Sequence, residues 1–308
     1  MGATSSIEWT DATWNPLLAK RRDNEKVGFH CVKVGSECSN CYAESINLRN
    51  LPHSGNGLPY TKDSGEKVEI LLSEKKMLQP IQWRKPRKIF VCSMTDLFGE
   101  FVPFNLIDEV FRVIQTRPDH TFQILTKRPE LALEYCNQRD TRMPDNVWMG
   151  ATAGRFDVAR RRLPYLAQIP ARVRYVSAEP LLGPIDFSFL WRPDKCPIHW
   201  LIAGGESGRR ARMSHPNWFR QVRDYCDKSH IPFFFKQWGT WWPSSQGCGG
   251  DEEEAKASRA VMDPNGNVIT GNRRKLPEGT ETFLRVGKQA AGRILDGVVH
   301  EAFPELAA

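Results

Sequence analysis

Six short apolar runs in the sequence each end in small, polar or charged residues, and stretches with helical periodicity separate them. The runs occupy residues 88–92, 121–125, 147–150, 173–176, 200–203 and 232–235. Because each run is continuously apolar, it is typical of a parallel strand that is buried on both faces. Together with a strand-like segment at residues 6–16, these runs predict an α/β fold. A complete or partial (β/α) barrel of parallel strands is the favoured architecture, and a doubly wound open sheet is the alternative.

The sequence changes character after residue 240. Residues 244–250 are rich in glycine and serine, four acidic residues follow at 251–254, and residues 263–266 carry a turn signal. We therefore expect a barrel with the cysteine loop over residues 1–240. Residues 241–308 should form a small α+β extension packed on that barrel. At 308 residues, the chain is long enough to bury a large core.

Polar residues and glycines follow several of the predicted strands at the point where each strand ends. Those that could bind a ligand are Asp96, Lys127, Glu179, Gly204, Gly205 and Glu206. Taken singly, each has a simpler explanation, such as a helix cap, a tight turn or a solvated loop. Taken together, they would gather on one face, because the carboxyl ends of parallel barrel strands build the active sites of this fold.

Three of the eight cysteines lie within eleven residues, at Cys31, Cys38 and Cys41, with the spacing C-x6-C-x2-C. A paired C-x-x-C without a secretory signal indicates metal or redox chemistry rather than disulfides. Three thiolates form an incomplete ligand shell. Zinc could complete it with His30 or a distant histidine, whereas a 4Fe-4S cluster could take three thiolates and leave one iron open.

The chain is basic, with a formal net charge of +7 and ten tryptophans. Its basic clusters lie at residues 21–22, 84–88, 160–162, 209–212 and 273–275. These clusters predict binding to a polyanion such as nucleic acid, although scattered solvated loops would explain them equally well. No apolar run of membrane length and no signal-peptide pattern are found, so we expect a cytoplasmic protein with no membrane partner. The oligomeric state stays open.

Several motifs resemble those of a phage and prophage family of unknown function, the three-cysteine-motif (DUF5131-type) family. The resemblance covers nearly the whole chain: residues 9–16, the cysteine loop, and residues 126–129, 177–183, 204–208, 235–239 and 295–297. In addition, Cys41-Tyr42-Ala43 and residues 93–103 are similar to radical S-adenosylmethionine enzymes related to spore photoproduct lyase. Phage origin would place the protein in the cytoplasm of the host cell.

The resemblance implies a radical S-adenosylmethionine-like barrel whose three cysteines hold a 4Fe-4S cluster. The open iron would chelate the amino and carboxylate groups of S-adenosylmethionine, and a reductant protein would supply electrons. Lys127 would pair with the cofactor carboxylate, while Asp96, Glu179 or Glu206 would accept from its ribose or ammonium group. By analogy, phage origin suggests modification of a nucleic acid or nucleotide. The catalytic residues are unknown.

Two other classes of function compete with this one. In a metal-dependent barrel hydrolase, Asp96, Glu179 and Glu206 would hold a divalent cation and the cysteines a structural zinc. In a zinc-stapled nucleic-acid-binding protein, the arginine clusters would carry the function and no reaction would occur.

Overall fold

The structure is a computed structural model that describes residues 5–49, 55–190, 196–247, 258–270 and 275–305. It divides into two compact units, which we describe separately. The first comprises Met1–Ala151 and Pro164–Arg174, and the second comprises Thr152–Leu163 and Tyr175–Ala308. The predicted division at residue 240 stays a prediction. The predicted acidic loop at 251–254 lies outside the described residues, as do residues 273 and 274 of the last basic cluster.

The main sheet has seven strands in the order β1-β5-β6-β7-β8-β9-β10. The neighbouring pairs β1–β5, β5–β6, β6–β7, β8–β9 and β9–β10 are parallel. These strands are β1 (Ala12–Trp14), β5 (Lys88–Val91), β6 (Thr121–Thr126), β7 (Val147–Thr152), β8 (Val173–Ala178), β9 (Trp200–Gly204) and β10 (Phe233–Gln237). The predicted α/β fold with parallel strands is confirmed. The strand order begins at β1 and ends at β10, so the sheet is open, which is the partial form of the expected barrel.

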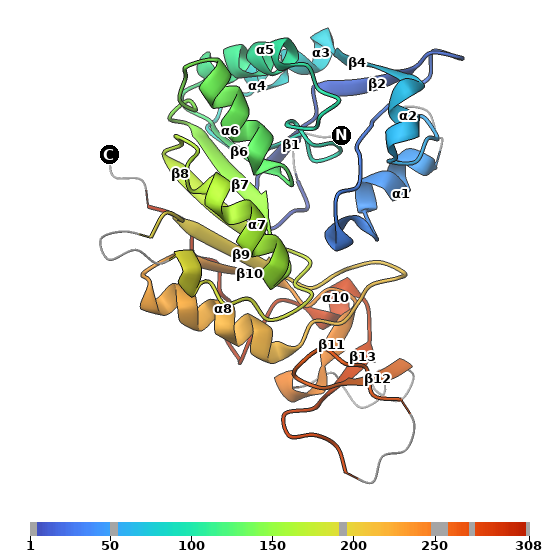
Figure 1. Cartoon of the computed structure of the whole chain (residues 1–308), viewed down its shortest axis with the longest axis vertical. Coiled ribbons are helices and arrows are strands. Elements are labelled where there is room, and N and C mark those ends of the chain that lie inside the picture. The colour runs from blue at the N-terminus through green and yellow to red at the C-terminus, as the bar shows by residue number, and fades with distance from the viewer. Residues whose placement is uncertain (1–4, 50–54, 191–195, 248–257, 271–274, 306–308) are drawn as a thin grey trace. The chain divides into compact units, whose positions relative to one another are not determined.

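Strands β6 and β7 in the first unit are followed by helices, as a βα pattern requires (Figure 1). Helix α5 (Phe104–Gln115), between β5 and β6, buries Ile107, Val110, Phe111 and Ile114, whose spacing places them on one helical face. Helix α6 (Pro129–Gln138) begins with a proline, which suits the first turn because its missing N–H would have no partner there. Helix α7 (Phe156–Leu166) follows β7.

A second, antiparallel sheet in the first unit joins β2 (Leu17–Arg21), β3 (Val27–Gly28) and β4 (Val68–Leu72). The short helices α1 (Tyr42–Leu48), α2 (Lys62–Glu66), α3 (Glu74–Met77) and α4 (Gln79–Gln82) complete the unit. The cysteine loop runs from this small sheet to α1, so the sheet anchors one end of the loop. None of the helices in the described residues is long and apolar enough to cross a membrane.

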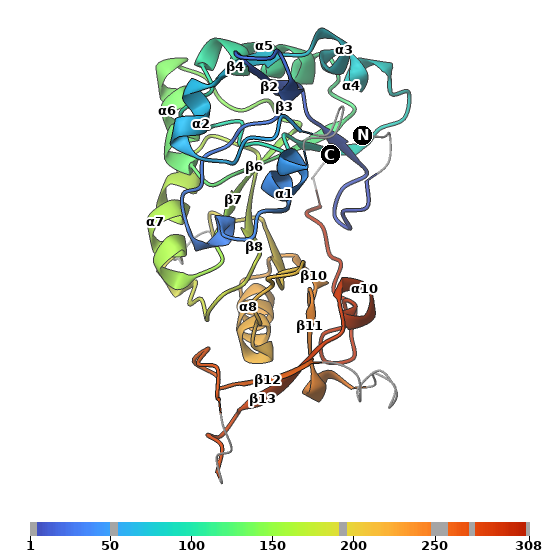
Figure 2. The same ribbon diagram turned by 90° about the vertical axis from the view of Figure 1, so that its right-hand side faces the viewer.

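In the second unit, helix α8 (Pro216–Lys228) lies along β9 and β10 (Figure 1). Trp200 of β9 is fully buried; its ring packs on Phe234 and Phe303, and its indole N–H donates to the Ala302 carbonyl at 2.8 Å. The C-terminal segment thereby closes the core of this unit. Strands β11 (Trp241–Pro243), β13 (Glu281–Arg285) and β12 (Ser258–Met262) form a small antiparallel sheet (Figure 2), and α10 (Lys288–Ala291) follows.

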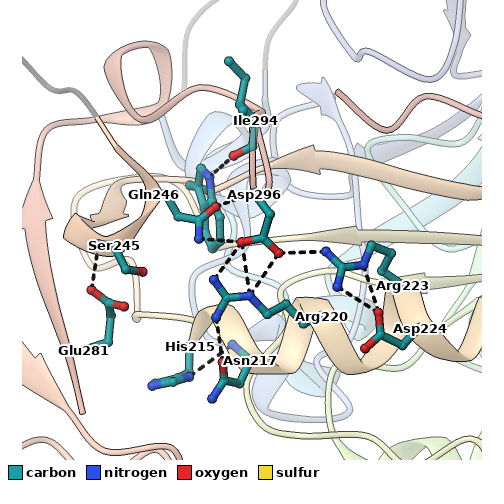
Figure 3. A network of polar contacts seen from close by, with 11 residues as sticks. His215, Asn217, Arg220, Arg223, Asp224, Ser245, Gln246, Glu281, Ile294 and Asp296 are labelled. Atoms are coloured by element: carbon teal, nitrogen blue, oxygen red, sulfur yellow. Dashed lines mark hydrogen bonds and ion pairs between the residues drawn. The ribbon is translucent and has the colours of Figure 1, made fainter. Parts of the chain in front are cut away.

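A single carboxylate, Asp296, ties the C-terminal segment to α8 (Figure 3). It accepts hydrogen bonds from Arg220 at 2.7–3.1 Å, from Arg223 at 2.7 Å and from Gln246 at 3.0 Å. The residue has a positive φ of 51°, a conformation that Asp and Asn tolerate better than other side chains. The hydrogen bond from Arg220 is the strongest influence on this carboxyl. With those from Gln246 and Arg223, it lowers the pKa of Asp296 despite the opposing effect of burial.

Replacing Asp296 with Asn should destabilise the protein by about 1–2 kcal/mol at pH 7, because charge-assisted hydrogen bonds are lost from a partly exposed site. Asn keeps the positive φ, so the effect reports on the charge. A depressed pKa stabilises the fold above the ordinary carboxyl pKa of about 4, and this contribution fades as the pH falls below it. Denaturant unfolding at several pH values should therefore show the two proteins converging in acid.

Asp224 offers a matched control, because it also pairs with Arg223 but lies adjacent to it on the exposed side of α8. Asp224→Asn should change the free energy of unfolding by only a few tenths of a kcal/mol. Equal losses for both variants would contradict a special role for Asp296.

Candidate functional site

The three cysteines of the C-x6-C-x2-C motif are free thiols on one loop of the first unit. The loop passes through a single turn of 3-10 helix at Ser36–Cys38 and ends at Cys41, which caps the amino end of α1. Cys38 is buried, and Cys31 and Cys41 are partly buried. Cys31 and Cys41 pack against the same small apolar cluster, which includes Phe29 and Tyr60. The loop is therefore part of the folded core.

The turn after β5 holds this loop through backbone carbonyls. Tyr42 donates its hydroxyl hydrogen to the Ser93 carbonyl at 2.5 Å, and Tyr60 donates to the Met94 carbonyl at 2.7 Å. From the turn itself, the Thr95 hydroxyl donates to the carbonyl of His30, the residue before Cys31. The cysteine loop consequently lies at the carboxyl end of β5, on the face where the sequence predicted a site.

Asp96 connects the ends of β5 and β6. Its buried carboxylate accepts from the Thr126 hydroxyl at 2.6 Å, from the Lys127 amide at 2.9 Å and from the Phe98 amide at 3.1 Å. Arg128 adds an ion pair at 3.3 Å. Because four donors from the protein already bind it, the Asp96 carboxylate holds the surrounding turns in place and is not available to a ligand.

Arg128 extends this network to the cysteines. Its side chain is almost fully buried, and its Nη2 donates to the Val32 carbonyl, next to Cys31, at 2.9 Å. Its Nε pairs with Glu100 at 2.6 Å. The position of the cysteine loop is thus fixed by a guanidinium that the turn after β6 supplies.

Lys127 lies among the thiols. Burial disfavours its ammonium, but Cys38, Cys41, Asp96 and Cys31 act on it as negative groups and raise the pKa of Lys127 overall. In the part of the chain that the structure describes, no ion pair engages this ammonium. Burial, together with the Asp96 charge, raises the pKa of the Cys31 thiol to about 12, so this thiol stays protonated until a metal or cation stabilises the thiolate. One cation and three thiols share a single site.

The arrangement of these thiols bears on the metal they could hold. Across the described ranges, no group of three or more His, Cys, Asp or Glu side chains is set to hold a metal ion. Thiolates that share one zinc ion lie about 3.8 Å apart, because each Zn–S bond is about 2.3 Å long. A cluster binds one thiolate per iron, so its ligands stand farther apart. If the thiols held such a cluster, Lys127 would offset part of its negative charge.

His30, the predicted fourth zinc ligand, is turned toward α2. Its Nε2 lies 3.1 Å from the position that a β-carbon on Gly65 would occupy, and its ring packs edge-on against Phe101. Burial, reinforced by the Arg128 charge, lowers the pKa of His30 to about 4, so the ring is neutral. In this orientation His30 is a buried part of the core.

A second polar group lies in the second unit, at the carboxyl ends of β8, β9 and β10. Lys236 donates to both oxygens of Glu179, at 2.7 and 3.0 Å, and the Gln237 amide approaches the same carboxylate at 3.4 Å. A β-bulge between Phe235 and Gln237 explains how two consecutive residues reach one partner, since side chains alternate between faces in a regular strand.

The two glycines and Glu206 also have structural explanations within this unit. A β-carbon on Gly205 would lie 1.9 Å from the Trp238 carbonyl oxygen, so only glycine fits there. A β-carbon on Gly204 would make ordinary contact with Glu179 at 3.4 Å. The Glu206 carboxylate accepts from the Arg212 guanidinium at 2.6 and 2.8 Å and from the Arg212 amide at 2.8 Å. Glu206 therefore shapes its own loop.

The predicted site residues fall into two groups. Asp96 and Lys127 lie with the cysteines in the first unit, whereas Glu179, Gly204, Gly205 and Glu206 lie in the second. Sequence reasoning left out Arg128 and Gln237, and it placed Lys236 at the same end of the barrel without giving it a ligand-binding role. Arg128 follows Lys127 directly, and Lys236 follows an apolar run, so the position of each at the end of a strand could have been predicted from the sequence. The residues with which they pair could not, because those residues are distant in the chain.

Residues 4–304 match the sequence family described as "Protein of unknown function (DUF5131)". Neither a curated protein nor a solved structure matches the chain. Because the match extends over nearly the whole sequence and includes the cysteine loop and both polar groups, the chain belongs to the DUF5131 family.

Proposed function

We propose that this protein is an iron–sulfur enzyme of phage type, similar to the radical S-adenosylmethionine enzymes, and that it acts on a nucleic acid or nucleotide. One observation carries the proposal. Cys31, Cys38 and Cys41 lie on one loop, which hydrogen bonds hold at the carboxyl end of β5, and all three are near enough to Lys127 to act on its ammonium. That face of an α/β barrel is where ligands bind.

In this proposal, Cys31, Cys38 and Cys41 each provide one thiolate to a 4Fe-4S cluster. When bound, such a cluster would supply the electron for reductive cleavage of S-adenosylmethionine and so give the protein radical chemistry. A reductant protein of the host would deliver that electron. The Val32 carbonyl accepts from Arg128, so the first ligand is held in place before the group binds.

The residues around the thiols have separate tasks. The Lys127 ammonium has no carboxylate partner within the described residues, which leaves it available for the carboxylate of S-adenosylmethionine. The Asp96 carboxylate accepts from the Lys127 backbone amide and thereby fixes the backbone position from which the lysine side chain extends. We assign Asp96 to positioning, because its oxygens are already engaged.

In the second unit, Lys236 orients the Glu179 carboxylate. The contact of Glu179 with the ribose or ammonium of the cofactor stays a prediction from the sequence. Glu206 is held by Arg212, so its loop would offer backbone groups beside Gly204 and Gly205.

The two rival functions have less support. A hydrolase would need Asp96, Glu179 and Glu206 to share one cation, yet hydrogen bonds from the protein already engage each carboxylate. A zinc-stapled binding protein would need its thiols close enough to share one ion. It would also be colourless, whereas an iron–sulfur protein is brown.

The first test is metal content. After anaerobic reconstitution with iron and sulfide, the unmutated protein should be brown and contain about four irons, whereas Cys38→Ala should fall to background. The reason is that a site with two thiolates cannot hold the cluster. Iron and sulfide assays together with visible absorption give the result. Full iron content in Cys38→Ala, or stoichiometric zinc in the unmutated protein, would refute the assignment.

Cys196→Ala is the matched control, because Cys196 lies in the second unit, where its thiol is 3.5 Å from the Tyr225 hydroxyl. It should retain full iron content. We expect the same for Cys136, Cys226 and Cys248.

The second test is cofactor affinity. Lys127→Ala should weaken S-adenosylmethionine binding on the order of ten- to a hundredfold, because a lost charge-assisted contact is worth roughly 1.5–3 kcal/mol. Calorimetry on the reconstituted protein measures this effect, and iron content should stay unchanged. Unchanged affinity would remove Lys127 from the site.

Lys33 is a suitable control, since it lies in the same loop but already pairs with Glu44 at 2.5 Å. Lys33→Ala should leave cofactor affinity within a factor of about two. A failure of the unmutated, iron-loaded protein to bind S-adenosylmethionine would exclude the radical mechanism itself.

A further inference from the structure

Strand β4 is an edge strand of the small sheet in the first unit, which has the order β3-β2-β4 (Figure 1). Its hydrogen bonds to β2 can be followed from both ends. The Arg22 amide donates to the Lys67 carbonyl at 3.0 Å, and the Ser73 amide donates to the Pro16 carbonyl at 3.0 Å. Because the register between these ends is continuous, the odd-numbered residues of β4 direct their backbone groups toward β2. The backbone groups of the even-numbered residues point the other way.

The outer edge of β4 therefore carries the amides and carbonyls of Val68, Ile70 and Leu72. Elsewhere in the described ranges, no group donates to these carbonyls or accepts from these amides. Exposed edges are commonly protected by a proline, a bulge or several charged residues. Strand β4 has no proline, its pairing with β2 is regular, and Glu69 is its single charged residue. This edge is thus available to another strand.

The edge of β4 matches the same edge of a second copy of the chain. Residues that face each other in an antiparallel pair hydrogen-bond together, so even-numbered residues must face even-numbered ones. With a twofold axis at Ile70, Ile70 faces its own copy and Val68 faces Leu72, and every outward amide and carbonyl has a partner. The next register in one direction would place Glu69 opposite Glu69, where like charges repel. The next register in the other direction would pair Val68 with a residue beyond the strand.

The side chains also favour a second copy in this register. Ile70 and Leu72 are half-buried, so pairing would cover the exposed part of each, Ile70 against Ile70 and Leu72 against Val68. At each end of the paired strands, Lys67 of one copy comes next to Glu74 of the other. Both charged side chains are exposed, and neither has a side-chain partner in the part of the chain that the structure describes. The twofold axis therefore creates two pairs of opposite charge.

We propose that this protein forms a homodimer in which the two β4 edges pair antiparallel around a twofold axis at Ile70. Because the same surface is used by both copies, the contact closes and does not extend into a fibre. Two five-residue strands form a small interface, so the dissociation constant should be on the order of 10 µM. This inference does not depend on the iron–sulfur assignment.

The test is sedimentation velocity on the full chain without added iron, from about 1 to 200 µM protein. Ile70→Pro should abolish the dimer over this range, because proline removes the central outward amide and no hydrogen bond within the protomer. Val27→Pro is the matched control. Val27 lies on β3, the opposite edge of the same sheet, and also directs its amide away from β2. It should dimerise like the unmutated protein, and circular dichroism melting checks that both variants fold.

Charge reversal tests the register with two exposed residues, and it decides the matter alone if Ile70→Pro does not fold. Lys67→Glu and Glu74→Lys should each weaken the dimer roughly tenfold, because two attractive pairs become repulsive. The variant with both substitutions should regain the original affinity, since the opposite charges are exchanged but still paired. A combined variant no tighter than the single ones would overturn the proposal, as would an unmutated protein that is monomeric throughout. A folded Ile70→Pro variant that still dimerises, or an equal loss in Val27→Pro, would also overturn it.

Discussion

The buried ion pair between Asp96 and Arg128 is the interaction on which the candidate site depends. It joins the turn after β5 to the turn after β6, and through the Val32 carbonyl it joins both to the cysteine loop. A buried ion pair is costly unless hydrogen bonds satisfy its remaining donors and acceptors. Here the Asp96 carboxylate has three further donors, and Arg128 also pairs with Glu100. The network is therefore suited to fixing geometry more than to adding stability.

The charge balance around the thiols has a consequence for metal binding. A buried thiol resists ionisation, as the raised pKa of Cys31 indicates, and a group that binds thiolates must overcome this resistance. The neighbouring Arg128 and Lys127 charges oppose that resistance at Cys31. Because thiolates form only when a ligand stabilises them, loading should be coupled to proton release. Hydrogen bonds to backbone carbonyls hold the cysteine loop independently of the thiols.

The polar group of the second unit is assembled by a different structural feature. A bulge in β10 turns Lys236 and Gln237 toward one carboxylate, and Gly205 allows the chain to pass against the Trp238 carbonyl. In both units the polar residues stand at the carboxyl ends of parallel strands.

The sequence by itself determined the fold class, because continuous apolar runs of strand length alternate with helical periodicity, and only parallel strands buried on both faces match that pattern. It also determined where polar residues would stand, since the end of a strand is a local feature. The tertiary structure alone decided which of them remain available. Asp96 is engaged by residues about thirty positions away, and Glu206 by Arg212. The segments before β1 and β5 lie together because β1 pairs with β5. Such contacts follow from strand order, and strand order leaves no trace in local periodicity.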